Sequence, residues 1–245
     1  MRRIAVIIPA AGKGERFGRR EKKIFAKLDG RPIFLRTLEL FVNRDDVCQT
    51  ILVVSRADLE EVKTRYGANL GFMGVRICEG GEARYDSVRA ALEIVNDDAE
   101  LVAIHDAVRP CATDAVIDAV FAEAAKTGAA ILASPLQGTI KRVSDSGTID
   151  ATVPRERLYE AQTPQVFKRQ VIAEAYANPP ESMEGVTDDA CLVERTGHPV
   201  SIVESNFTNL KITTRADITL ANAILKARPA AKPQKKLGAF EEAQW

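Results

Sequence analysis

Apolar and polar positions alternate in two ways along most of the chain. Short runs rich in β-branched residues are typical of buried strands, and they occupy residues 4–10, 50–55, 101–107 and 129–135. Longer amphipathic patterns with helical spacing occupy residues 32–43, 57–67, 114–128 and 216–228. Continuous apolar strands separated by helices are typical of a sheet that helices cover on both faces. The pattern therefore predicts an α/β fold with a mostly parallel, twisted sheet.

Three loops rich in small or charged residues fall at the predicted ends of strands. They span residues 9–18, 79–87 and 105–111. In open α/β sheets, ligands bind outside the carboxyl ends of the strands, near the point where the strand order reverses. These three loops are therefore the predicted ligand site.

Residues 137–154 break this rhythm. They contain two alternating runs, 139–144 and 148–154, joined by the turn sequence Asp145-Ser146-Gly147. We expect a hairpin that projects from the fold as an arm. After residue 226 the periodicity is lost, so we expect one domain over residues 1–226 and a flexible tail over 227–245, too short for a further domain.

Composition narrows the class of protein. Lys plus Arg equals Asp plus Glu at 34 each, so no net charge favours nucleic acid or an anionic membrane. The four cysteines are far apart and form no C-x-x-C, which is typical of reduced thiols. Neither a run of ~18 apolar residues nor a signal peptide is visible. We expect a cytoplasmic protein that binds neither membranes nor nucleic acids.

The first loop carries the strongest local charge. Seven Lys or Arg lie within residues 13–27 against two Glu. The loop is not a dinucleotide fingerprint, because Phe17 replaces the third glycine, and it is not a P-loop, because Gly14 follows Lys13. Small residues let backbone N–H groups approach a nucleotide, and Arg16 and Lys23 suit a triphosphate. The alternative for such a charge run is a solvated helix face.

Residues 9–33 resemble the signature loop of sugar-nucleotide-type nucleotidyltransferases. Further motifs, with "HDAVRPC" and "AQTPQVF" the most specific, cover residues 4–226 and resemble the 2-C-methyl-D-erythritol 4-phosphate cytidylyltransferase family of the non-mevalonate isoprenoid pathway. The resemblance implies a single Rossmann-like domain and a homodimer formed through the arm. It also implies transfer of CMP from CTP to 2-C-methyl-D-erythritol 4-phosphate, which gives 4-diphosphocytidyl-2-C-methyl-D-erythritol and pyrophosphate with Mg²⁺ or another divalent cation.

The resemblance assigns four catalytic cations. Arg16 and Lys23 match the residues that stabilise charge on the triphosphate in the transition state. Lys211 matches the cation that positions the incoming phosphate, and Arg155 matches an arm residue that reaches the neighbouring subunit's site. The nucleophile is a phosphate oxygen already ionised at neutral pH, so the reaction needs no general base.

The resemblance also assigns binding residues. Those expected to bind the nucleotide are Pro9, Ala10, Ala11, Gly12, Gly81, Glu82, Ser87, Asp106 and Ala107. Those expected to bind the second substrate are Asp106, Arg109, Thr139, Arg155, Thr163, Thr187 and Lys211. Asp106 can bind sugar hydroxyls or approach Mg²⁺, which phosphate oxygens should hold for the most part. We expect His105 to be a structural hydrogen-bonding residue.

Some alternatives stay open. The register through Phe25 favours Lys23 as the catalytic lysine, but Lys22 is adjacent, and Ala83 replaces a more usual polar residue near the base. The acceptor could be another polyol phosphate, such as ribitol 5-phosphate. A regulatory nucleotide-binding module without chemistry would need the glycines of the loop but not Arg16, Lys23 and Lys211 together.

Overall fold

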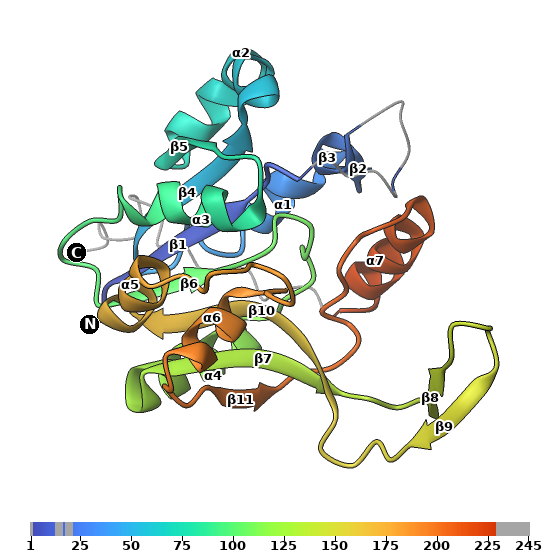
Figure 1. The fold of residues 1–245 in the computed structure, drawn as a ribbon. Helices are drawn as coiled ribbons and strands as arrows, with labels where there is room; N and C mark the ends of the chain where they lie inside the picture. The colour runs from blue at the N-terminus through green and yellow to red at the C-terminus, as the bar shows by residue number, and fades with distance from the viewer. Residues whose placement is uncertain (1, 13–16, 18–21, 229–245) are drawn as a thin grey trace, which may run out of the picture.

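The computed structural model describes residues 2–12, 17 and 22–228. Seven strands form one sheet in the order β11-β7-β10-β6-β1-β4-β5 (Figure 1). Their bounds are β1 Ile4–Pro9, β4 Val47–Ser55, β5 Val75–Gly80, β6 Leu101–Ile104, β7 Ala129–Pro135, β10 Tyr159–Lys168 and β11 Ser201–Glu204. Neighbouring strands run parallel except at β10, which is antiparallel to β6 and β7. The prediction of a mostly parallel sheet is confirmed.

Helices cover both faces of this sheet. Their bounds are α1 Ile33–Leu38, α2 Arg56–Phe72, α3 Arg84–Leu92, α4 Asp114–Thr127, α5 Arg169–Ala177, α6 Asp189–Arg195 and α7 Arg215–Ala227. Successive side chains of a strand point to opposite faces. On β1, Val6 and Ile8 pack in a core with residues of α1, α2, α4 and α7, whereas Ile7 packs in a second core with α3, α5 and α6. A strand that is apolar throughout therefore fills two cores.

The ends of α4 show how local residues set helix bounds. The hydroxyl of Thr113 accepts a hydrogen bond from the Val116 N–H at 3.4 Å, which is a side-chain cap. The helix ends at Gly128, whose φ of 98° is in the left-handed region that favours glycine. The helix predicted at 32–43 is shorter, because α1 ends at Leu38 and turns follow it. Before α1 lie the short 3-10 helix η2 (Lys23–Phe25) and the strands β2 (Lys27–Leu28) and β3 (Arg31–Pro32).

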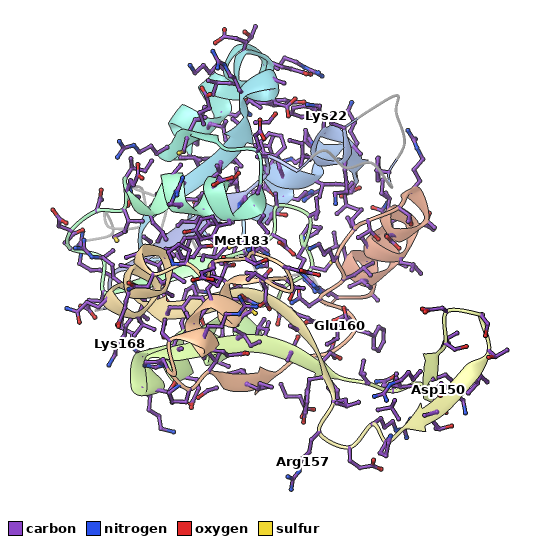
Figure 2. All side chains as sticks on the ribbon, viewed as in Figure 1. Lys22, Asp150, Arg157, Glu160, Lys168 and Met183 are labelled. Carbon is purple, nitrogen blue, oxygen red and sulfur yellow. The ribbon has the colours of Figure 1, made fainter. Side chains whose placement is uncertain are left out.

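The predicted hairpin is present and projects from the sheet as an arm (Figures 1 and 2). Its strands are β8 (Ile140–Val143) and β9 (Ile149–Val153), and they pair antiparallel. At the turn, Gly147 has a φ of 80° and its N–H donates to the Ser144 carbonyl at 2.9 Å. The alternating pattern and the turn sequence thus predicted this element at the right place.

The last helix extends slightly past the predicted end of the domain. Helix α7 ends at Ala227, and the Arg228 guanidinium donates to the Ala112 carbonyl at 3.5 Å. The predicted flexible tail otherwise lies outside the described residues and stays a prediction. Within residues 2–12, 17 and 22–228, no helix is long and apolar enough to cross a membrane.

Candidate active site

A pocket lies where β1, β5 and β6 end, at the carboxyl edge of the sheet. It is lined by Pro9, Ala10, Ala11 and Gly12 after β1, by Lys23 and Ile24 of η2, by Glu82, Ala83, Arg84 and Ser87 around the start of α3, by Asp106, Ala107 and Val108 after β6, and by Lys211. This is the place that the strand-and-loop pattern predicted. Residues more than 200 positions apart in the chain thus meet in one cavity.

Small residues bring the two nucleotide-side loops close together. A Cβ atom at Gly80 would lie 2.6 Å from the Ser87 Oγ and 3.1 Å from the Ala11 Cβ, so only glycine fits between these loops. The buried Ser87 hydroxyl donates to the Ala83 carbonyl at 3.1 Å. The Ala10 N–H donates to the Val53 carbonyl at 2.7 Å. The backbone wall of the pocket is therefore closely packed.

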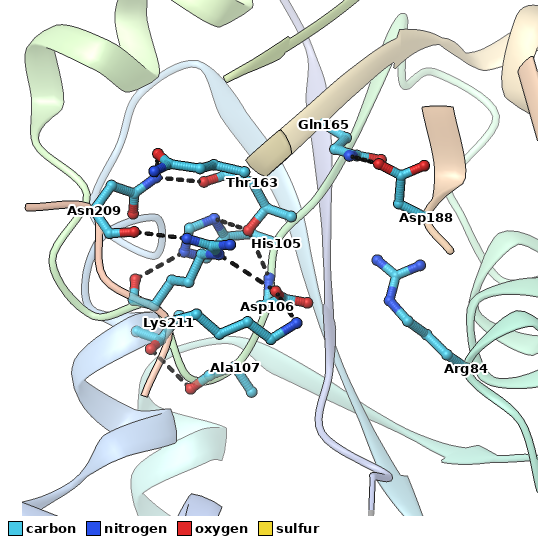
Figure 3. Close-up of polar contacts among 12 residues, drawn as sticks. Arg84, His105, Asp106, Ala107, Thr163, Gln165, Asp188, Asn209 and Lys211 are labelled. Atoms are coloured by element: carbon cyan, nitrogen blue, oxygen red, sulfur yellow. Dashed lines mark hydrogen bonds and ion pairs between the residues drawn. The ribbon is translucent and has the colours of Figure 1, made fainter. Parts of the chain in front are cut away.

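Asp106 is the buried anion of the pocket. Its Oδ2 lies 2.8 Å from the Lys211 Nζ and 3.4 Å from the Arg109 Nε (Figure 3). Burial by itself would raise the pKa of the Asp106 carboxyl, but Lys211 and Arg84, followed by Arg109, hold that pKa well below its usual range. Asp106 is therefore ionised at neutral pH and can accept hydrogen bonds.

A network of buried hydrogen bonds fixes the position of Asp106. The Thr163 hydroxyl accepts from the Asp106 N–H at 3.0 Å and lies 3.1 Å from the His105 Nδ1 (Figure 3). The His105 Nε2 lies 3.0 Å from the Arg109 carbonyl oxygen, and the Arg109 Nη1 donates to the Asn209 carbonyl at 2.7 Å. Burial lowers the pKa of His105 to about 4, so this imidazole is neutral at pH 7. These contacts agree with the structural role expected for His105.

The structure places the predicted nucleotide-binding residues at the pocket, with one exception. Eight of them line it, and the ninth, Gly81, precedes the lining residue Glu82. Lys23 and Lys211 line it as well. Arg16 lies outside the described residues, so its predicted role stays a prediction.

The predicted acceptor residues are more scattered. Arg109 and Thr163 are buried behind Asp106 and do not line the pocket, although both contact Asp106. Thr139, Arg155 and Thr187 are exposed and also lie outside the lining set. Arg155, at the base of the arm, donates a hydrogen bond to the Gln137 carbonyl. The described part of one chain therefore does not bring all seven acceptor residues together.

The structure separates the two adjacent lysines. The Lys22 ammonium forms an ion pair with Asp58, whose hydrogen-bond partners also include the Ser55 hydroxyl at 2.6 Å. Lys23, the first residue of η2, lines the pocket, whereas Lys22 is not among the lining residues. This placement agrees with the register that favoured Lys23.

Sequence reasoning missed Arg84, which lines the pocket from the first turn of α3. Its Nη2 lies 2.6 Å from an oxygen of Asp189, a residue 105 positions away at the start of α6. The only signal available was an arginine within the predicted 79–87 loop. Nothing in the local pattern relates that arginine to α6.

A metal would find few protein ligands here. Among the described residues, no group of three or more His, Cys, Asp and Glu side chains is arranged to hold a metal ion. Asp106 and Glu82 are the carboxylates that line the pocket, and Asp106 already pairs with Lys211. So few carboxylates suit a divalent cation whose other ligands are phosphate oxygens of a bound ligand.

Fold and pocket together give an α/β protein with a pocket at the carboxyl edge of its sheet, lined by two lysines and an ionised aspartate. Residues 4–227 match the 2-C-methyl-D-erythritol 4-phosphate cytidylyltransferase family, and the chain belongs to that family. It is therefore a member of a nucleotidyltransferase enzyme family.

Individual relatives and solved structures support this family membership. The protein named 2-C-methyl-D-erythritol 4-phosphate cytidylyltransferase in Rhodopirellula baltica is 45% identical over 233 residues, which cover 91% of this chain and 94% of that one. The crystal structure of the protein of the same name from Thermus thermophilus has a TM-score of 0.75 at 30% identity, and the match covers 92% of this chain and all of that chain. The crystal structure of 4-diphosphocytidyl-2C-methyl-D-erythritol synthase from Anaerococcus prevotii has a TM-score of 0.76 at 28% identity, covering 92% and 96% of the two chains.

Proposed function

We propose that the protein transfers CMP from CTP to 2-C-methyl-D-erythritol 4-phosphate and releases pyrophosphate. The observation that carries this proposal is the meeting of Lys23, Asp106 and Lys211 with the small-residue loop in one pocket of a chain that belongs to this family. A cytoplasmic location stays a prediction from the sequence.

Alignment and charge neutralisation supply the catalysis. The attacking oxygen belongs to a phosphate that is ionised at neutral pH, so no general base is required. Lys23, together with Arg16, neutralises charge on the triphosphate as the α-phosphorus is attacked. Lys211 holds the incoming phosphate, and its ion pair with Asp106 aims its ammonium into the pocket. Neutral, buried His105 takes no part in proton transfer.

The nucleotide lies along the small-residue wall. Backbone groups of Ala10, Ala11 and Gly81 and the hydroxyl of Ser87 face the base, and acceptors there select the exocyclic amine of cytosine. A site built to bind this amine leaves its acceptors unpaired with uracil, so CTP should be strongly preferred to UTP. Asp106 accepts hydrogen bonds from sugar hydroxyls.

A divalent cation, Mg²⁺ or another, accompanies CTP. Phosphate oxygens would hold it for the most part, and Asp106, a buried carboxylate that lines the pocket, could approach it. When bound, the ion neutralises charge on the triphosphate. The small number of carboxylates lining the pocket supports this arrangement.

The arm completes the acceptor site of a second copy in a homodimer. Val143 and Ile149 on the arm are 55% and 65% exposed, although both are apolar and belong to strands. Arg155 and Thr139 stand at the base of the arm, outside the pocket of their own chain. Burial of the arm against a partner would cover these apolar side chains and carry Arg155 to the partner's pocket.

Pyrophosphate release tests the proposal directly. The purified protein is mixed with CTP, Mg²⁺ and either 2-C-methyl-D-erythritol 4-phosphate or ribitol 5-phosphate, and UTP replaces CTP in a parallel series. We expect release with CTP and the erythritol phosphate and a much lower kcat/KM in the other combinations. Equal rates with both acceptors, or with CTP and UTP, would contradict the assigned substrates.

A further inference from the structure

We propose that Arg84 is a positioning residue for the acceptor, held in place by Asp189 and Tyr176. Arg84 would connect helix α3, on the nucleotide side of the pocket, to the loop before α6. It would also orient Asp106 toward the acceptor hydroxyls. This inference rests on the proposed function, because it assigns a residue to the acceptor half of that site.

The anchor of Arg84 is buried and specific. The Asp189 side chain is fully buried, with one oxygen 2.6 Å from the Arg84 Nη2 and the other accepting from the Tyr176 hydroxyl at 2.6 Å. The Tyr176 ring stacks on the Tyr85 ring with centroids 4.8 Å apart. The Tyr85 hydroxyl donates to the Tyr176 carbonyl at 3.0 Å. Both oxygens of the buried carboxylate are therefore engaged.

At neutral pH Arg84 stays protonated and the Tyr176 hydroxyl stays uncharged. Burial by itself would lower the pKa of Arg84, but the charge of Asp189 more than offsets this and holds the pKa above its usual range. Burial, reinforced by Asp189, raises the pKa of Tyr176 well above its usual range, so the phenol remains a hydrogen-bond donor. Because Asp189 balances the charge of Arg84, we assign the guanidinium an orienting role rather than that of a further phosphate-binding cation.

Arg84 faces the pocket as well as its anchor. Its side chain is 33% exposed although Asp189 is not exposed at all, and it lines the pocket together with Asp106. In Figure 3, Lys211 reaches Asp106 from one side of the view, and Arg84 lies on the other side with its guanidinium below Asp188. The positive charge of Arg84 also helps to lower the pKa of the Asp106 carboxyl, so Asp106 lies in the field of both Lys211 and the anchored Arg84.

The same anchor locates the loop before α6. Asp188 caps this helix, since its Oδ1 accepts from the Cys191 N–H at 3.0 Å, and its Oδ2 accepts from the Gln165 amide at 2.7 Å. The Gln165 Oε1 accepts from the N–H groups of Asp189 and Ala190 at 3.1 and 3.0 Å. Thr187, a predicted acceptor contact, immediately precedes this capped start. Arg84 therefore joins the pocket that Asp106 lines to the loop that carries Thr187, and Asp106 and Thr187 are both assigned to the acceptor.

Steady-state kinetics of Arg84→Met and Tyr176→Phe, with both substrates varied, test this assignment. We expect Arg84→Met to raise the KM for the acceptor about tenfold or more, as for loss of a charge-assisted contact, and to leave the KM for CTP within about twofold. Tyr176→Phe removes only the hydroxyl on Asp189 and keeps the stacked ring, so it should give a smaller change of the same kind. Arg84→Lys should restore part of the acceptor affinity.

The matched control is Arg65→Met on α2, which removes the exposed pair of Arg65 with Glu61 and should behave like the wild type. If the wild type is active and Arg84→Met and Tyr176→Phe lower affinity for both substrates equally, or leave both unchanged, the inference is wrong. A wild type that releases no pyrophosphate with the erythritol phosphate would instead overturn the proposed function, and this inference with it. If Arg84→Met does not fold, the kinetics of Tyr176→Phe alone test the inference.

Discussion

Around the pocket, Asp106 and Arg109 are buried charges whose partners lie in the same chain, whereas along the arm most side chains are exposed and two of them are apolar. A buried charge requires partners, so the pocket holds its geometry without help from another molecule. The arm has a two-stranded ladder and a turn but no core of its own. Such a hairpin is at most marginally stable alone.

The predicted site is divided between these two regions. Most of the residues predicted to bind the nucleotide lie together within one chain, because the loop after β1, the start of α3 and Asp106 all line one pocket. Part of the predicted acceptor half, Arg155 and Thr139, stands on the arm instead. We expect substitutions in the nucleotide half of the pocket to affect the use of CTP and substitutions on the arm to affect the acceptor alone.

The largest effect should come from the pocket lysine. We expect Lys23→Ala to lower kcat by about two orders of magnitude or more, since one transition-state donor is typically worth ~3–4 kcal/mol. Its thermal stability should change little, because Lys23 lines a pocket rather than a core. Turnover with CTP and the erythritol phosphate, and a melting curve, measure the two quantities.

Lys22→Ala is the control for this prediction. It removes the ion pair with Asp58 outside the pocket, so it should keep near-normal turnover. Normal turnover in Lys23→Ala together with an inactive Lys22→Ala would show that the register of the loop is wrong.

The arm should give the next largest effect. We expect Arg155→Ala to raise the KM for the acceptor by about tenfold to a hundredfold, the range for a charge-assisted hydrogen bond. The KM for CTP should stay within about twofold of the wild type. Initial rates over a matrix of both substrates separate the two constants. An equal rise in both would contradict the division of the site.

The smallest effect concerns pH and the network behind Asp106. The pKa of His105 is lowered from 6.5 to about 4, so the unfolded chain binds more protons than the folded chain between these pH values. Stability therefore falls as the pH is lowered through that window, by at most about 1.4 kcal/mol per pH unit from this group. His105→Asn should show a shallower fall than the wild type in urea titrations at pH 4.5, 5.5 and 6.5. An identical slope would contradict a buried, neutral imidazole.

Much of the fold could be predicted because its signals are local. The alternation in residues 139–154 and the turn at Gly147 predicted the arm, and the apolar run before Asp106 placed that residue at a strand end. Strand order is set by packing between distant segments, so the antiparallel insertion of β10 between β6 and β7 was not predicted.

The residues of the candidate site were predicted or missed for the same reason. Residues of contiguous loops, such as Ala10 and Ala11, were found from their own sequence. Arg84 was missed because its position depends on Asp189, 105 residues further along. Arg109 was assigned to the acceptor by resemblance, but its burial follows from contacts with Asp106 and the Asn209 carbonyl, which no local pattern reveals.

Complementation between two defective subunits tests the central claim, a transferase site completed by the arm of a second copy. Lys23→Ala and Arg155→Ala proteins are mixed and allowed to exchange subunits, and pyrophosphate release is followed at an acceptor concentration well below the KM of Arg155→Ala, where each protein alone has low activity. About half the dimers should be heterodimers, each with one intact site of two, so about a quarter of wild-type activity should return. No recovery, with subunit exchange demonstrated by mass or fluorescence, would mean that Arg155 acts within its own chain or not at all.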